Sequence, residues 1–415
     1  MTELERIGTL AKEASVYLGT LDTEGKNKLL TAIADALRAN ADYITSENAK
    51  DLENARENGL SKAMQDRLLF DCTRIDSSAD GVLQVASLPD PVGEVMETYI
   101  RPNGMTVEKR RVPMGVVGII YEARPNVTVD TAVLCIKASN AVILRGGKEA
   151  IHTNTAIVKV MKKALSDIGA DENMIGFVED TSRDSANAMM KLKGYIDVLI
   201  PRGGAGLINA VVMNSTVPVI ETGVGNCHIY VDKSADIKKA VDIVVNAKTS
   251  RPSVCNAAES LLVHKDVDDS FYKLLDEEFK KKKVKVYGYG DIMNKLTCQR
   301  EATCEDFATE FLDYAISAKT VASVDEAIEH IRKFSTGHSE CIVTEDENAS
   351  QLFTSCIDAA AVYVNVSTRF TDGFEFGFGA EIGISTQKLH ARGPMALPEL
   401  TSTKYLINGN GQVRG

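Results

Sequence analysis

The feature that most restricts the fold is a repeated alternation of short apolar runs with helix-like stretches from residue 115 onward. Apolar runs occupy residues 115–121, 141–144, 174–178, 197–200 and 217–220, and stretches with helical spacing separate several of them. A similar alternation continues from residue 228 to residue 365. Strands that alternate with helices form parallel sheets whose two faces are covered by those helices. We therefore expect an α/β chain with two such domains.

Two further regions depart from this alternation. Residues 1–90 carry apolar residues at helical spacing, for example over 27–37, and are expected to form helices. Residues 98–112 alternate around Pro102-Asn103-Gly104, which predicts a β-hairpin with its turn at Asn-Gly. Because an isolated two-stranded hairpin is only marginally stable in water, we expect this one to pair with something else, such as a second subunit.

Composition argues against several classes of protein. The 415 residues include 47 basic and 58 acidic side chains, a formal charge of −11 that argues against general affinity for nucleic acid or anionic membranes. No apolar run reaches the ~18 residues of a membrane span, and the charged N-terminus lacks the apolar core of a signal peptide. The eight cysteines show no paired spacing, which favours free thiols in a reducing cytoplasm.

One cysteine stands in a setting that suits catalysis. The segment 250–260, SRPSVCNAAES, lies between a predicted helix and an apolar strand, so Cys255 falls in a polar connection, where catalytic groups often lie. A thiol becomes a good nucleophile when nearby positive charge favours its thiolate, and Arg251 stands four residues earlier. From the local pattern alone, a buried structural cysteine remains the alternative.

A glycine turn, Gly203-Gly204, follows another apolar strand and precedes a predicted helix. Backbone N–H groups at such a helix start bind pyrophosphate, and glycine lets a ligand approach the backbone closely. The spacing is too short for the full dinucleotide-binding fingerprint, so an ordinary glycine turn is the alternative interpretation.

Four features, taken together, resemble the aldehyde dehydrogenase superfamily. Residues 115–126 (GVVGIIYEARPN) resemble the segment that carries its oxyanion asparagine, and residues 201–206 (PRGGAG) resemble its cofactor-phosphate loop. Residues 221–223 (ETG) resemble its E-x-G segment, and Cys255 follows Glu221 by 34 residues, close to the superfamily's spacing for the nucleophile. The resemblance implies a Rossmann-type cofactor domain, an α/β catalytic domain and a β-hairpin oligomerisation arm.

Within the superfamily, residues 121–126 (YEARPN), 250–256 (SRPSVCN) and 327–340 are similar to the gamma-glutamyl phosphate reductase family, and the match extends over essentially the whole chain. This resemblance implies NADPH-dependent reduction of L-glutamyl 5-phosphate to L-glutamate 5-semialdehyde with release of phosphate, a step of proline biosynthesis. It also implies that Cys255 attacks the acyl carbon and carries a thioester, which hydride then reduces.

The resemblance assigns roles to further residues. Asn126 and the backbone N–H of Cys255 are implied to stabilise the negative charge that develops on the acyl oxygen. Gly203 and Gly204 are implied to hold the cofactor phosphates.

The implied cofactor contacts extend to three charged residues. Lys148 stands near the place where NAD-using relatives carry an acidic ribose contact, so a cation there implies NADPH, with Arg145 and Lys148 as its contacts. Glu310 is implied to contact the ribose, although the spacing of Glu310-Phe311 departs by one residue from the superfamily's E-x-F.

Other polar residues keep two interpretations. Arg124 and Arg251 lie beside the catalytic motifs and either bind the substrate's anionic groups or form structural ion pairs. Glu221 stands where hydrolytic relatives carry a base, but here phosphate is the acyl acceptor, so a structural or proton-handling role is expected. His330 and His338 have no metal-ligand partners at useful spacing, so we expect structural histidines and no metal site.

The implied architecture divides the chain into three parts. Residues 1–96 and 114–224 would bind the cofactor, residues 225–395 would form the catalytic domain, and residues 97–113 and 396–415 would form the oligomerisation arm. The arm would add its C-terminal strand to a partner's sheet, so a homodimer or tetramer is expected. A glutamate kinase that hands over the labile acyl phosphate is a candidate partner.

Two other functions stay open from the sequence. One is a hydrolytic aldehyde dehydrogenase, which makes a carboxylic acid without phosphate. The other is a binding or structural protein that keeps the fold without catalysis, and the presence of Cys255, Asn126 and the glycine turn argues against it.

Overall fold

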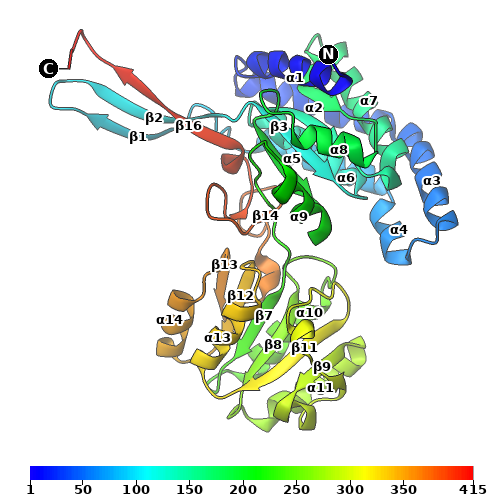
Figure 1. Cartoon of the computed structure of the whole chain (residues 1–415), viewed down its shortest axis with the longest axis vertical. Coiled ribbons are helices and arrows are strands. Elements are labelled where there is room, and N and C mark those ends of the chain that lie inside the picture. The colour runs from blue at the N-terminus through cyan, green and yellow to red at the C-terminus, as the bar shows by residue number, and fades with distance from the viewer. Residues whose placement is uncertain (415) are drawn as a thin grey trace. The chain divides into compact units, whose positions relative to one another are not determined.

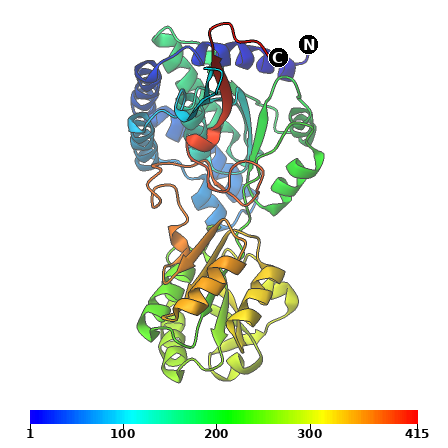
Figure 2. The ribbon, with the colours of Figure 1, turned by 90° about the vertical axis from the view of Figure 1, so that its left-hand side faces the viewer.

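The computed structural model describes residues 1–414, apart from the side chain of residue 63, and the chain divides into two compact units (Figures 1 and 2). Unit 1 consists of Met1–Glu221, Gly377–Gly383 and the chain from Met395 onward, and unit 2 consists of Thr222–Phe376 and Ile384–Pro394. Each unit is therefore assembled from segments that lie far apart in the sequence.

Unit 1 begins with helices, as the spacing of apolar residues predicts. They are α1 (Glu3–Leu18), α2 (Thr23–Ala39), α3 (Ala41–Glu57), α4 (Lys62–Leu68) and α5 (Cys72–Ser87). The side chains of Thr2, Asp22, Ser61 and Asp71 each accept a hydrogen bond from a backbone N–H of the helix that follows. These caps satisfy N–H groups that the first turn of a helix leaves without a partner. The helical region expected over residues 1–90 is confirmed.

A parallel sheet with the strand order β5-β4-β3-β6 forms the centre of unit 1. Its strands are β3 (Val116–Tyr121), β4 (Ala141–Arg145), β5 (Ile175–Phe177) and β6 (Val198–Arg202), and the helices that follow them in sequence are α6 (Pro125–Lys137), α7 (Ile151–Asp167), α8 (Arg183–Met190) and α9 (Ala205–Asn214). Strands β3 and β4 are buried along their whole length, as expected where helices cover both faces. Residues that directly follow β3, β4 and β6 lie at one edge of the sheet, where ligands of such folds bind.

One local prediction in unit 1 needs correction. The run at residues 217–220, predicted as a strand, forms only an isolated bridge between Val219 and Leu199. Pro218 lies within this run and has no N–H to donate to a ladder, which explains the short pairing. Helix α6 begins at Pro125, because proline is well suited to the first position of a helix.

The predicted hairpin is present in unit 1 and belongs to a three-stranded antiparallel sheet (Figure 1). Strands β1 (Val95–Ile100) and β2 (Thr106–Pro113) are joined by a turn in which Gly104 has a φ of +86°, a conformation that glycine adopts without strain. Strand β16 (Thr401–Asn408) pairs with β2 along its whole length. The hairpin therefore finds a partner within its own chain, while Ile100 and Ile407 on the outer strands stay exposed.

Unit 2 is built on a parallel sheet with the strand order β10-β9-β11-β8-β7-β12-β13. Its strands are β7 (Cys227–Val231), β8 (Ala258–His264), β9 (Lys285–Tyr289), β10 (Cys298–Glu301), β11 (Ala315–Val321), β12 (Ser339–Val343) and β13 (Ala361–Val364). Unit 2 also contains four longer helices and the short helix α12 (Cys304–Phe307). Two 3-10 helices, η3 (Gly290–Asn294) and η4 (Thr368–Phe370), and a short antiparallel pair, β14 (Ile384–Ser385) with β15 (Gly393–Pro394), complete it.

Those four helices cover both faces of the sheet of unit 2 (Figures 1 and 2). Ile229 in β7 packs with α10 (Ile237–Thr249) and α11 (Asp269–Lys282), whereas the next residue, Tyr230, packs with α13 (Val324–Phe334) and α14 (Glu347–Cys356). Successive side chains of a strand point to opposite faces, so one apolar strand supplies two cores. The α/β alternation predicted from residue 228 onward is confirmed.

Candidate active site

Cys255 lies in the connection between α10 and β8, and its side chain is half-buried. Gly225, just before β7, packs directly against it: a Cβ atom at Gly225 would lie 1.4 Å from the carbonyl oxygen of Cys255. The thiol of Cys227, in β7, donates a hydrogen bond to the same oxygen at 3.2 Å. Two contacts, from Gly225 before β7 and from Cys227 within β7, therefore hold the backbone of the predicted nucleophile in place.

The residue after the cysteine, Asn256, is held by the segment that follows β13. The side-chain amide of Asn256 donates to the carbonyl oxygen of Thr371 at 2.9 Å. The hydroxyl of Thr368 donates to the backbone carbonyl oxygen of Asn256 at 2.7 Å. Thr368 begins a 3-10 helix, η4 (Thr368–Phe370). The cysteine loop is thus tied to a segment more than 100 residues later in the sequence.

Arg369, in η4, brings positive charge to the cysteine loop, and it is not among the predicted site residues. Its Nη1 donates to Asn256 Oδ1, and its Nε donates to Ser250 Oγ at 3.0 Å. Burial lowers the pKa of Arg369, the charge of Arg251 lowers it further, and the thiol of Cys255 acts in the opposite direction. A guanidinium remains charged at neutral pH, and nearby positive charge favours a cysteine thiolate. Arg251 itself is exposed.

Glu310 supports the start of β7, because its Oε1 accepts a hydrogen bond from the backbone N–H of Gly225 at 2.8 Å. A buried ion pair lies close by: Lys248 Nζ on α10 and Glu259 Oε2 in β8 are 2.5 Å apart, and both side chains are fully buried. Burial raises the pKa of Glu259, whereas the charge of Lys248 lowers it. The other carboxylate oxygen of Glu259 accepts a hydrogen bond from the N–H of Leu312 at 3.3 Å. The predicted ribose contact of Glu310 stays a prediction.

In unit 1, Asn126 is exposed in the first turn of α6, and its amide donates to Asp130 Oδ2 at 2.9 Å. Burial raises the pKa of Asp130 to about 6, while the hydrogen bond from Asn126 and the charge of Arg202 act to lower it. Arg124 is the residue directly before α6 and is half-buried. The predicted oxyanion donor and one predicted substrate-binding arginine therefore stand at the start of one helix.

Gly203 and Gly204 form the turn between β6 and α9, and their backbone faces the side chain of Glu122. The N–H of Gly204 donates to Glu122 Oε2 at 3.0 Å. A Cβ atom at Gly203 would lie 2.7 Å from the same carboxylate oxygen and 2.8 Å from a side-chain carbon of Leu207, so a larger residue does not fit there without movement. The start of α9 thus already holds an anionic oxygen, as the N-termini of helices do.

The two cations predicted to bind the cofactor have different surroundings. Lys148 is exposed in the 3-10 helix η1 (Lys148–Ala150), just after β4. Arg145, the last residue of β4, is buried, and its Nη2 donates to the carbonyl oxygens of Thr181 at 2.6 Å and Ser182 at 2.8 Å. Burial lowers the pKa of Arg145. Part of the Arg145 guanidinium is therefore committed to the start of α8, whereas the Lys148 ammonium faces solvent.

The two histidines predicted to be structural lie in the interior of unit 2. The ring of His330 contacts those of Phe307 and Phe334, at centroid distances of 4.8 and 4.7 Å, and burial lowers its pKa to about 3. His338 is buried, with its Nδ1 2.8 Å from Ser339 Oγ. Both positions fit a structural role. Within residues 1–414, no group of three or more His, Cys, Asp or Glu side chains is arranged to hold a metal ion.

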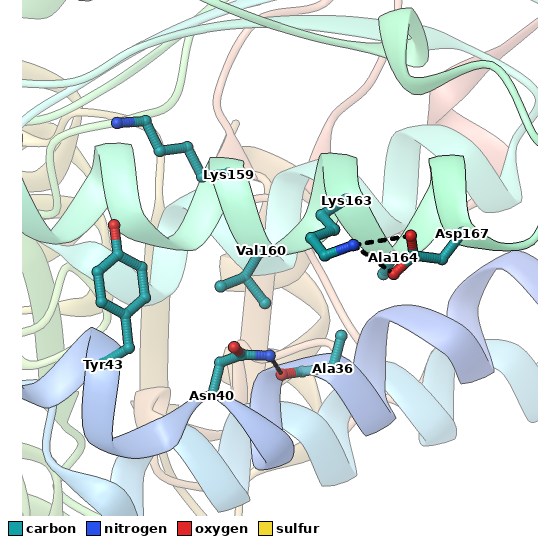
Figure 3. Close-up of a pocket in the computed structure, with 8 residues that line it drawn as sticks. All are labelled: Ala36, Asn40, Tyr43, Lys159, Val160, Lys163, Ala164 and Asp167. Carbon is teal, nitrogen blue, oxygen red and sulfur yellow. Dashed lines mark hydrogen bonds and ion pairs between the residues drawn. The ribbon is translucent and has the colours of Figure 1, made fainter.

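A cavity of about 200 Å³ in unit 1 contains none of the predicted site residues (Figure 3). It lies between the α2–α3 junction and α7 and is lined by Ala36, Asn40, Tyr43, Lys159, Val160, Lys163, Ala164 and Asp167. Lys163 pairs with Asp167 at 2.8 Å across one turn of α7. The lining contains no cysteine, and we assign the cavity no part in the predicted chemistry.

Comparison with known proteins places these features in a family. The model of the aldehyde dehydrogenase family matches residues 2–288. A gamma-glutamyl phosphate reductase of Clostridium botulinum is 58% identical over 414 residues, covering 100% of both chains, and one of Enterococcus faecalis is 54% identical over 414 residues, covering 100% of this chain and 99% of the relative.

Solved structures give the same result for the fold. The crystal structure of a gamma-glutamyl phosphate reductase from Thermotoga maritima matches with a TM-score of 0.97 and 48% identity, and the match covers 100% of both chains. An acetylating aldehyde dehydrogenase from Geobacillus thermoglucosidasius, at 19% identity, matches with a TM-score of 0.71 over 100% of this chain and 98% of the other, which shows the shared fold alone. The predicted aldehyde dehydrogenase-like α/β fold is confirmed. No helix within residues 1–414 is both long and apolar enough to cross a membrane.

Proposed function

The chain belongs to the aldehyde dehydrogenase family and, within it, to the gamma-glutamyl phosphate reductases, and from this premise we propose that it reduces L-glutamyl 5-phosphate to L-glutamate 5-semialdehyde with NADPH. The observation that carries the proposal is 58% identity over the full length of a relative with that name. The reaction releases inorganic phosphate and would serve proline biosynthesis.

Cys255 is the proposed nucleophile. Its thiolate attacks the acyl carbon, a C–S bond forms, the C–O bond to phosphate breaks, and phosphate leaves with the electron pair. The contacts of Gly225 and Cys227 with the carbonyl group of Cys255 hold the loop in place, and the charge of Arg369 favours the thiolate. When bound, the reduced nicotinamide supplies the hydride that converts the thioester to the aldehyde.

The acyl oxygen becomes negatively charged in both tetrahedral states, and a preorganised donor there is worth about 3–4 kcal/mol. We assign this role to the side-chain amide of Asn126 and the backbone N–H of Cys255. The hydrogen bond from Asn126 Nδ2 to Asp130 orients the amide, and an amide nitrogen carries a second N–H that can serve the substrate.

The start of α9 fits the phosphates of a dinucleotide cofactor. The N–H of Gly204 already donates to the carboxylate of Glu122, and a side chain at Gly203 would block the approach. A cofactor phosphate would take the place of this carboxylate at the helix N-terminus. We therefore assign Gly203 and Gly204 to the cofactor phosphates.

The cofactor assignment to NADPH rests mainly on Lys148. Its exposed ammonium, directly after β4, suits a 2′-phosphate in a position where an acidic residue would suit the free ribose hydroxyl. Arg145 is assigned as a second contact, although its Nη2 is engaged with backbone carbonyls. Glu310 is assigned to the ribose.

Substrate recognition and assembly complete the proposal. Arg124 and Arg251 are assigned to the anionic groups of L-glutamyl 5-phosphate. The sheet of β1, β2 and β16, with exposed Ile100 and Ile407 on its outer strands, is assigned as the contact of a homodimer or tetramer. A glutamate kinase is proposed as the supplier of the labile acyl phosphate. Light scattering of the purified chain tests the assembly, and trapping of freely diffusing intermediate tests the hand-over.

Oxidation of L-glutamate 5-semialdehyde with NADP⁺, measured with and without phosphate or arsenate, tests the proposed reaction. We expect NADPH to form continuously only when one of these acyl acceptors is present. A hydrolytic aldehyde dehydrogenase would form glutamate without phosphate, and that result would reject the proposal. NADPH binding with no thiol-dependent turnover would favour a non-catalytic protein.

A further inference from the structure

Among the described residues, no acidic side chain forms an ion pair with either of two arginines at the cysteine loop. Arg251 precedes the cysteine by four residues and is exposed, and Arg369 reaches the same loop from η4. Arg369 donates hydrogen bonds to neutral acceptors, Ser250 Oγ and Asn256 Oδ1. Across residues 1–414, neither arginine belongs to a salt bridge. The positive charge of the cysteine loop is therefore not cancelled by a direct ion pair.

The charges of the two arginines also oppose each other. Burial is the main cause that lowers the pKa of Arg369, and the charge of Arg251 is the second. Asp372 acts on Arg369 in the opposite sense, but its carboxylate already accepts backbone N–H groups of Phe374 at 2.9 Å and Glu375 at 3.4 Å. Holding like charges together costs free energy that a bound anion recovers. A loop held in this arrangement by hydrogen bonds to neutral groups is suited to bind an anion.

We propose that Arg369 and Arg251 bind the phosphate group of the acyl phosphate while Cys255 attacks, which makes Arg369 a further catalytic residue. The inference rests on the proposed function. The connectivity of the substrate favours its phosphate over its α-carboxylate: the phosphate oxygen is bonded to the very carbon that the sulfur attacks, whereas the α-carboxylate lies at the other end of the molecule. We therefore assign the cations of the loop that carries Cys255 to the phosphate.

The pair acts on the same group in both directions of the reaction. In the forward direction, the C–S bond forms, the C–O bond breaks, and the leaving phosphate gains negative charge that two guanidinium groups stabilise. In the reverse direction, a phosphate oxygen attacks the thioester carbon, the C–O bond forms, and the thiolate of Cys255 leaves with the electron pair. Phosphate is then a substrate, so its KM reports on the site directly.

Oxidation of L-glutamate 5-semialdehyde with NADP⁺ and phosphate is the test. In Arg369→Gln we expect the KM for phosphate to rise at least about tenfold, and the KM values for the aldehyde and NADP⁺ to stay within about twofold. Arg369→Lys keeps a charge and should recover part of the phosphate affinity. Arg332→Gln removes another exposed arginine of unit 2, which donates to the carbonyl of Cys356 at 3.3 Å, and should change none of the three constants.

Alkylation of Cys255 by iodoacetamide gives a second readout that needs no turnover. Phosphate should slow alkylation of the wild-type chain, and Arg369→Gln should need at least about tenfold more phosphate for the same protection. If the loss of the bonds to Ser250 and Asn256 prevents Arg369→Gln from folding, Arg251→Gln tests the same site through an exposed side chain.

The outcomes separate the inference from its premise. A raised aldehyde KM with an unchanged phosphate KM would assign the arginines to the α-carboxylate and overturn the inference. Unchanged KM values in Arg369→Gln, together with unchanged protection of Cys255 by phosphate against alkylation, would overturn it as well. A wild-type chain that oxidises the aldehyde equally well without phosphate would instead reject the proposed function.

Discussion

Gly225→Ala tests whether the backbone of Cys255 must be held in place for the reaction. The added Cβ atom would lie 1.4 Å from the carbonyl oxygen of Cys255, 2.3 Å from its carbonyl carbon and 2.6 Å from its Cα. A Cβ atom essentially never approaches other atoms closer than 3.0 Å, so the two segments must separate by about 1.6 Å at the oxygen. No flexible side chain can absorb this shift, because all three contacts are with backbone.

The size of the effect follows from that displacement. A misplacement of ~1 Å in a catalytic centre costs on the order of 100-fold in rate, or about 2.7 kcal/mol in activation free energy. The shift also disturbs two bonds that hold the loop, from Cys227 to Cys255 at 3.2 Å and from Gly225 to Glu310 at 2.8 Å. We expect kcat to fall by at least about 100-fold, and the free energy of unfolding to fall by about 1–3 kcal/mol.

The assay is the initial rate of phosphate-dependent aldehyde oxidation at saturating substrates, together with urea unfolding. Gly81→Ala is the control, because Gly81 lies in α5 and a Cβ atom there meets nothing within 4 Å. The control should retain both activity and stability. A folded Gly225→Ala variant with the kcat of the wild-type chain would refute the reasoning.

Three further changes have defined outcomes. Lys148→Glu should weaken NADPH binding much more than NADH binding, and an equal loss in fluorescence titrations would remove Lys148 from the 2′-phosphate site. Burial raises the pKa of Asp130 from about 4 to about 6, so the folded chain holds that proton more tightly and the free energy of unfolding should fall as pH rises through this range. Asp130→Asn should flatten that part of the profile in urea unfolding, and an unchanged slope would count against the assignment. Lys248→Met leaves Glu259 buried without its partner and should lower the free energy of unfolding by about 3–5 kcal/mol. Adding Glu259→Leu should recover most of this loss, and no recovery in urea unfolding would contradict the prediction.

The elements that the sequence predicts well are those buried on both faces of a sheet. Strands β3 and β4 consist almost wholly of apolar residues, and such runs are read directly from the sequence. Strands β9 and β10 are not predicted, because β9 alternates between exposed and buried positions and β10 is a largely exposed outer strand. The run at residues 217–220 shows the opposite error: a strand is predicted where only an isolated bridge forms, because Pro218 lacks the N–H needed for a ladder.

The candidate site is only partly readable from local patterns. They place Cys255 in a polar connection and Gly203-Gly204 at a helix start, and both placements are observed. They do not reveal Arg369, which stands 114 residues after Cys255 and reaches its loop because β7, β12 and β13 follow β8 in the sheet. Its local signal is no more than a polar segment, STRF, after the last strand of the parallel sheet. The thiol of Cys227 is likewise one of eight in the sequence and gains its role only through strand pairing.

We propose that Cys255 carries a glutamyl thioester that phosphate discharges. The most direct measurement is peptide-mapping mass spectrometry of the chain after acid quench, with L-glutamate 5-semialdehyde and NADP⁺ present and phosphate absent. We expect one glutamyl adduct on the peptide that contains Cys255, its loss when phosphate is added, and its absence in Cys255→Ser, which should still bind NADPH. An adduct on a different residue, or turnover by Cys255→Ser at the wild-type rate, would contradict the claim.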